Sequence, residues 1–235
     1  MRLIQLGALL VTCSLATGAI ADRSDDEFNI YIKGIKVGRL SLAVESETHS
    51  YAARLLVRTT GLIAKLAPYR FDAAVKGHLQ NDQNLPRRYS EKSDTGKRQT
   101  DKTILYVNNV PKVTQSKPRQ PHWLDPRQQK GRIDTLTATY ELLQTRTKDD
   151  LCQQTLYLFD GTRAVDISVS EKTVKGPNIS CQGLYQRIGG FSKAQMEKGV
   201  SFPFTLRYSP TETGTYQLQT MTFETLRGRA SFHRR

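Results

Sequence analysis

The chain has few of the residues that usually carry chemistry in proteins. Its 235 residues include only three cysteines and four histidines. The histidines are His49, His78, His122 and His233, and no two of them stand at the spacing of metal ligands. The sequence contains no Gly-x-Ser-x-Gly elbow, no phosphate-binding loop and no His-Glu-x-x-His helix. We therefore predict that the protein is not an enzyme and has neither a cofactor nor a metal site.

The sequence also lacks an uninterrupted run of the roughly 20 apolar residues that a transmembrane helix needs. Its N-terminus has another pattern, in which Arg2 precedes an apolar stretch and Ala19-Ile20-Ala21 precedes the charged Asp22. This order is typical of a secretory signal peptide. We expect a signal peptide at residues 1–21, cut after Ala21, and a mature periplasmic protein.

Two alternatives for the N-terminus stay open at this point. The apolar stretch could remain as an uncleaved anchor. Cys13, which follows Leu10-Val11-Thr12, could instead be a lipid-modified cysteine of a lipoprotein.

Two cysteines, Cys152 and Cys181, remain after the expected cleavage. Two cysteines in an oxidising compartment usually pair, so we predict a disulfide between them. The alternative is two free buried thiols.

The net charge of +13 is the strongest compositional signal. Most of the excess comes from residues 86–132, where twelve lysines and arginines face four acidic residues. Such a surface attracts polyanions, and export argues against nucleic acid. We predict contact with an anionic envelope surface, and we place it at Arg87, Arg88, Lys97 and Arg98. The alternative is that the charge only keeps the protein soluble.

Period-two alternation dominates the mature chain and indicates antiparallel strands with one buried face. Turn signals such as Lys33-Gly34 and Asp160-Gly161 separate the segments. Two helices interrupt them, one at residues 62–67 and one capped by Asp134. We predict a mainly β fold, a curved antiparallel sheet (half-barrel or open barrel) with one or two short helices against the concave face. Residues 22–235 would form a single domain with a basic, loop-rich segment at 86–132.

Strand alternation and helical spacing together predict which side chains face the interior of such a sheet. If the interior holds an apolar ligand, these side chains would line the cavity. The predicted cavity residues are Leu40, Leu42, Leu55, Val57, Leu62, Leu66, Leu136, Tyr140, Phe204 and Leu206.

Several of these features resemble an uncharacterised family of exported periplasmic domains of unknown function in Gram-negative bacteria. The resemblance rests on residues 31–38, the helix from Asp134 to Leu143, Phe159-Asp160-Gly161-Thr162-Arg163 and the late Cys181. More distantly, the order of elements is similar to the half-barrel lipoprotein carriers and their outer-membrane receptors. That second resemblance implies a curved sheet whose helices plug an apolar cavity for acyl chains.

Two functional hypotheses follow. In the first, the protein is a periplasmic binding protein that holds a lipid or other amphiphile without catalysis. In the second, it is a structural or assembly factor of the envelope that acts by protein–protein contacts. An open apolar cavity would favour the first, and an interior filled by the protein's own side chains would favour the second.

Overall fold

A computed structural model gives the fold and describes residues 22–225 and 228–235. The expected signal peptide, with Cys13 and Ala21, lies outside the described residues. Its cleavage therefore stays a prediction.

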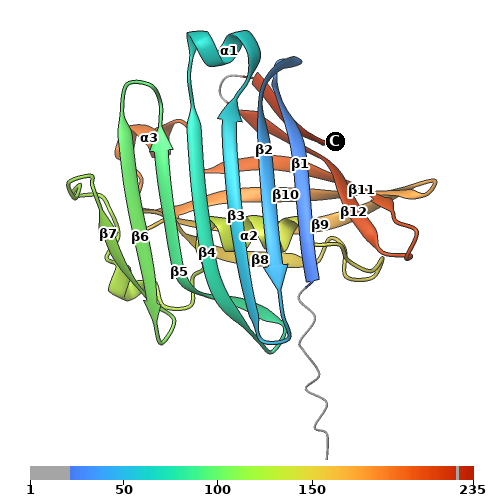
Figure 1. The fold of residues 1–235 in the computed structure, drawn as a ribbon, viewed down its shortest axis with the longest axis horizontal. Helices are drawn as coiled ribbons and strands as arrows, with labels where there is room; N and C mark the ends of the chain where they lie inside the picture. Colours follow the sequence, from blue (N-terminus) through green and yellow to red (C-terminus); the bar gives the residue numbers. More distant parts are fainter. Residues whose placement is uncertain (1–21, 226–227) are drawn as a thin grey trace, which may run out of the picture.

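The described residues form one antiparallel sheet of thirteen strands (Figure 1). The strands in chain order are β1 (Asp22–Ile32), β2 (Ile35–Ser46), β3 (Ser50–Thr59), β4 (Arg70–Gln80), β5 (Gln83–Asp94), β6 (Gln99–Val107), β7 (Val110–Gln115), β8 (Gln154–Phe159), β9 (Ala164–Lys175), β10 (Asn178–Gly189), β11 (Ser201–Pro210), β12 (Tyr216–Thr225) and β13 (Gly228–Arg234).

The sheet consists of two meanders, β1 to β7 and β8 to β13, which join where β1 pairs with β13. Strands β7 and β8 end the strand order, and the described chain does not pair them with each other. The predicted fold class, a curved and open antiparallel sheet, is confirmed.

The sheet bends over on itself, so that β8 to β12 run crosswise behind β1 to β7 (Figure 1). Register shifts interrupt the pairing in β1 at Ile30/Tyr31, in β4 at Lys76/Gly77 and in β11 at Arg207/Tyr208. A β-bulge of this kind bends a strand and increases its twist. The bulges therefore help to turn a meander into a half-barrel.

Two glycines make room for aromatic rings inside the bend. A Cβ atom on Gly183 would lie 2.1 Å from Cζ of Phe204, and one on Gly77 would lie 2.3 Å from Cε1 of Tyr51. Both rings therefore lie directly on the backbone of a neighbouring strand. Any larger residue at either glycine would force the ring to move.

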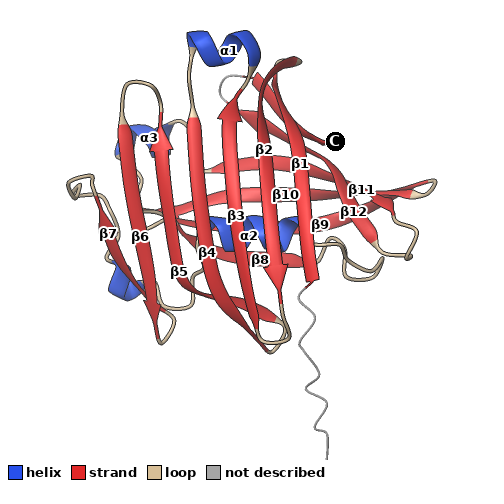
Figure 2. Cartoon of the chain, in the orientation of Figure 1, coloured by secondary structure: helices blue, strands red, loops and turns tan. Residues whose placement is uncertain are grey.

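The helices are short (Figure 2): α1 (Gly61–Leu66), α2 (Thr135–Leu143) and α3 (Lys193–Glu197), with a 3₁₀ helix, η1, at Pro126–Gln128. Helix α2 lies between the two layers and contacts β3, β4, β5 and β8. Strand β7 and helix α3 were not among the elements expected from the sequence. The basic segment 86–132 contains most of β5, all of β6 and β7, and then a loop with η1.

Candidate functional site

The concave face of the sheet is the natural place for a ligand, and the structure fills it with apolar side chains. Six of the ten predicted cavity residues are buried in one continuous core, and Val57 and Tyr140 pack against that core half-buried. The six buried residues are Leu40, Leu42, Leu55, Leu136, Phe204 and Leu206. Strand alternation thus identified side chains that share one interior, but these side chains contact one another.

Four hollows among the described residues lie outside this core. They have volumes between about 210 and 400 Å³ and are open to solvent. Most of their lining residues are polar, and Phe204 and Tyr140 are the only predicted cavity residues among them. None of the four has the apolar lining that an acyl chain needs.

Leu62 and Leu66 were predicted to line the cavity, and this prediction is wrong. Both lie on α1, which buries none of its residues, and their exposed fractions are 68% and 74%. The physical reason is topological. Helix α1 joins the ends of β3 and β4, neighbouring strands in which Arg58 opposes Arg70, so the connection stays beyond the strand ends and cannot reach the interior.

A buried polar network fixes α2 inside the half-barrel. Oδ1 of Asp134 accepts hydrogen bonds from the backbone N–H groups of Leu136 and Thr137, both at 2.9 Å. The Thr137 hydroxyl donates to Oδ2 of Asp134 at 2.7 Å. Because that hydroxyl has a single proton, the hydroxyl of Tyr51 on β3 must donate to Thr137, at 2.8 Å. We call Asp134, Thr137 and Tyr51 the Asp134 network.

The network perturbs two ionisation equilibria. Burial raises the pKa of the Asp134 carboxyl to about 6, although the hydrogen bonds from Thr137 and Leu136 oppose the shift. Burial, and then the neighbouring charge of Asp134, raises the pKa of the Tyr51 hydroxyl far above its usual value. Asp134 has no exposed surface, so no substrate can reach it. Its chemistry is that of a helix cap inside a core.

A second polar contact joins the two layers. The amine of Lys102 on β6 lies 3.0 Å from Oε1 of Glu91 and donates to the backbone carbonyl of Asp160, in the turn between β8 and β9. The Tyr89 hydroxyl donates to the other Glu91 oxygen at 2.6 Å. One of the twelve basic residues of segment 86–132 is therefore part of the interior.

The four residues predicted to contact an anionic surface are all exposed, but they form two groups. Arg87 and Arg88 lie in the first half of β5, whereas Lys97 and Arg98 lie in the turn between β5 and β6. Six further residues of β5 separate Arg88 from the start of that turn, which corresponds to roughly 20 Å. The predicted surface contact is therefore not one compact cluster of charge.

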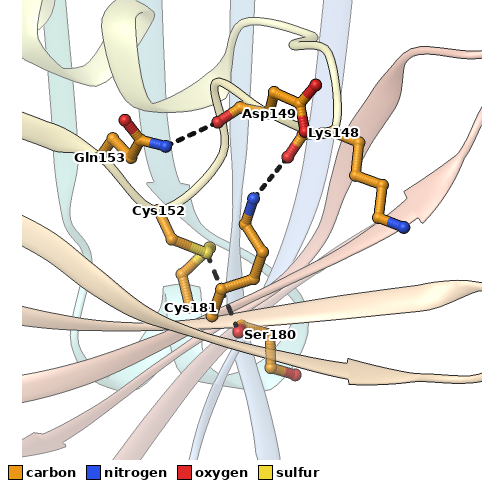
Figure 3. Close-up of a disulfide and its surroundings, with 7 residues drawn as sticks. Lys148, Asp149, Cys152, Gln153, Ser180 and Cys181 are labelled. Carbon is orange, nitrogen blue, oxygen red and sulfur yellow. Dashed lines mark hydrogen bonds between the residues drawn. A yellow bond between two sulfur atoms is a disulfide. The ribbon is translucent and has the colours of Figure 1, made fainter.

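The predicted Cys152–Cys181 disulfide is confirmed, with a Cα–Cα distance of 5.2 Å. It ties the segment that follows α2 to β10 (Figure 3). Two hydrogen bonds support the same segment: Lys172 donates to the carbonyl of Lys148, and the Gln153 side chain donates to the carbonyl of Asp149. The disulfide thus fixes the segment that follows the inner helix to the second meander.

The edge of β8 is a surface that sequence reasoning missed. The amide of Phe159 and the carbonyl of Tyr157 bond to Ile133 and not to β9, so alternate residues of β8 direct their backbone groups away from the sheet. By this alternation Thr155 presents its N–H and C=O at an open edge. Thr155 and Tyr157 are exposed and line a hollow of about 210 Å³.

Residues 22–225 and 228–235 contain no group of three His, Cys, Asp or Glu side chains that could hold a metal ion. Within the same ranges, no helix is long and apolar enough to span a membrane.

Residues 27–185, more than half of the chain, match the family model described as "Protein of unknown function (DUF3108)". No curated protein matches the chain. A crystal structure of a "Beta-barrel-like Protein of Domain of Unknown Function DUF1849 from Brucella abortus" is similar with 12% sequence identity and a TM-score of 0.48, over 92% of this chain and 96% of that chain.

Proposed function

The chain belongs to the DUF3108 family, whose description states no function, and we propose that it is a non-catalytic protein of the cell envelope that acts by contact with another protein. The observation that carries the proposal is the filled interior. Leu136 of α2 is 1% exposed and packs in the same core as Leu42 and Leu206 from opposite meanders. A carrier would need an apolar space there. This favours the structural or assembly factor over the binding protein for an amphiphile.

The disulfide supports the location in the envelope. Disulfides persist in oxidising compartments and are rare in the cytosol. Cys152 and Cys181 are both buried, which further protects the bond from reduction. Together with the Ala19-Ile20-Ala21 pattern, this supports export to the periplasm.

The edge of β8 is the surface that we assign to the protein contact. A strand edge with free N–H and C=O groups accepts an extended segment of a partner by adding it to the sheet. Here Thr155 supplies the backbone groups, and the exposed side chain of Tyr157 stands beside them. The hollow along this edge gives a partner's side chains a place to pack.

The interior can be tested without knowing any partner. Protein purified without detergent is expected to show, in native mass spectrometry, the mass of the polypeptide alone. It is also expected to bind no fluorescent fatty acid, because the residues that would line the site already contact one another. A copurified lipid, seen as added mass and retained when the exposed Leu62 and Leu66 are both replaced by serine, would overturn the proposal and restore the carrier.

The edge can be tested by photo-crosslinking in intact envelopes. A benzophenone amino acid at Tyr157, which is 54% exposed, is expected to give one discrete protein adduct. The same group at Val174, which is 51% exposed at the end of β9, should give none. Adding Thr155→Pro should abolish the adduct, since proline removes the edge N–H but no bond to β9. Equal labelling from both positions would contradict the assignment.

A further inference from the structure

The end of the half-barrel that carries α1 has an unusual surface. The three most exposed large apolar side chains of the described residues are Leu66 at 74%, Leu62 at 68% and Ile35 at 63%. All three belong to two short segments, the β1–β2 turn at residues 32–36 and the α1 connection at residues 61–69. We call these two segments together the α1 rim.

The two segments lie side by side. The amide of Thr60 donates to the carbonyl of Val37 at 3.1 Å, and Gly38 opposes Thr59 in the pairing of β2 with β3. Ile35 and α1 therefore extend from the same ends of paired strands, and α1 contacts both strands. In Figure 1 α1 projects beyond the strand ends. The apolar side chains thus stand on a projecting edge.

The rim carries positive charge only. Its two segments contain Lys33, Lys36 and Lys65, all exposed, and no aspartate or glutamate. None of the three lysines forms an ion pair with another described residue. The turn that holds Lys97 and Arg98 adjoins the rim, because a Cβ atom on Gly96 would lie 2.5 Å from Cγ of Pro68.

Clustered apolar side chains on a projecting edge are unfavourable in water and usually mark a contact surface. The charges indicate which partner fits. Lysine is depleted in protein–protein interfaces, whereas at a membrane surface its alkyl stem packs on apolar neighbours while the amine reaches the headgroups. Apolar residues ringed by unpaired lysines complement an anionic lipid surface.

We propose that the α1 rim docks the protein onto an anionic lipid bilayer. Ile35, Leu62 and Leu66 enter the boundary between headgroups and acyl chains, and the three lysines bind lipid phosphates. Leu62 and Leu66 would thus meet lipid on the outside of the molecule and not within it. Thr155 and Tyr157 are not part of the rim, so the β8 edge stays free for a protein while the rim is docked.

Vesicle flotation tests the proposal with vesicles of phosphatidylcholine alone and of phosphatidylcholine mixed with phosphatidylglycerol. The protein is expected to float with the mixed vesicles and to dissociate as salt is added. Neutralising the rim with Lys33→Gln, Lys36→Gln and Lys65→Gln should lower the partition coefficient roughly a hundredfold at low salt. Replacing Leu62→Ser and Leu66→Ser should lower it at least about tenfold.

Matched variants control for charge and for exposed apolar area. Lys76→Gln, Lys130→Gln and Lys175→Gln remove the same charge from exposed sites away from the rim. Val174→Ser and Ile188→Ser remove exposed apolar side chains from the other meander. Both control sets should leave binding within about twofold of the wild type. All the substituted side chains are exposed, so unchanged circular dichroism will show that each variant folds.

Three outcomes would overturn the proposal. They are no binding to the mixed vesicles, an equal loss of binding in the rim and control lysine variants, or binding that is unchanged by Leu62→Ser and Leu66→Ser. A second measurement tests insertion itself. An environment-sensitive dye on Leu66→Cys should shift to the blue with mixed vesicles, and the same dye on Val174→Cys should not. Because neither readout involves the β8 edge, failure here leaves the protein-contact proposal standing, and the converse also holds.

Discussion

Removing the Cys152–Cys181 disulfide is expected to lower the free energy of unfolding by about 3.5 kcal/mol. In the chain-entropy model a bond that closes a loop of this length, with a sequence separation of 29, restricts the unfolded chain by about that amount. For a domain of this size the midpoint of thermal unfolding should fall by about 10 °C. Cys152→Ser with Cys181→Ala is the suitable pair, because Cys181 has no exposed surface and a hydroxyl there would be left unpaired.

Urea unfolding of the wild type with and without a reducing agent provides the control. The reduced wild type should approach the double variant, since both lack the same covalent constraint. If the double variant and the oxidised wild type unfold at the same urea concentration, the bond contributes nothing to stability. In that case the two cysteines would be better explained as packing residues.

The sequence predicted the sheet well because alternation and turn chemistry are local signals. Leu40, Leu42 and Val44 alternate with the smaller Ser41 and Ala43, and all three are buried in β2. Asp134 precedes a helical apolar pattern and does cap α2. The capping box that starts α3, Ser192 with Gln195, was also present in the sequence and was not recognised. Strand β7 is short and contains a proline, so its alternation was too weak to detect.

The candidate sites were less predictable, because they depend on how distant segments meet. Whether Leu136 lines a cavity or fills it depends on the total volume of the side chains that both meanders direct into the interior. No local sequence pattern gives that total volume. Leu62 and Leu66 have helical spacing, yet only the pairing of β3 with β4 shows that α1 stays outside. The open edge of β8 is likewise a property of the completed sheet order.

Replacing Asp134→Asn is expected to alter how stability depends on pH. The pKa of Asp134 is about 6 in the folded protein, above its usual value of 3.8, and burial is the main cause. Between these two pH values the folded protein holds a proton that the unfolded chain has lost. The wild type should therefore lose stability as pH rises through this window, by up to about 3 kcal/mol in all.

Asparagine preserves the hydrogen bonds of the Asp134 network without the charge. Its Oδ1 can accept from the amides of Leu136 and Thr137, and its Nδ2 can donate to the Thr137 hydroxyl, which then donates to Tyr51. The stability of Asp134→Asn relative to the wild type should thus rise between about pH 4 and about pH 7. The difference in the free energy of unfolding between the variant and the wild type removes the contribution of the other carboxyl groups, because they titrate in both proteins.

Asp134→Ala distinguishes the effect of the carboxyl charge on stability from the effect of the helix-capping hydrogen bonds. It also removes the charge, but it leaves the amides of Leu136 and Thr137 without an acceptor in a buried site, a loss of about 1 to 2 kcal/mol at every pH. Its pH dependence should match that of Asp134→Asn while its stability stays lower throughout. Chemical unfolding at a series of pH values measures both. If the difference between Asp134→Asn and the wild type does not change across the window, the carboxyl group is not protonated there, and burial does not control its ionisation.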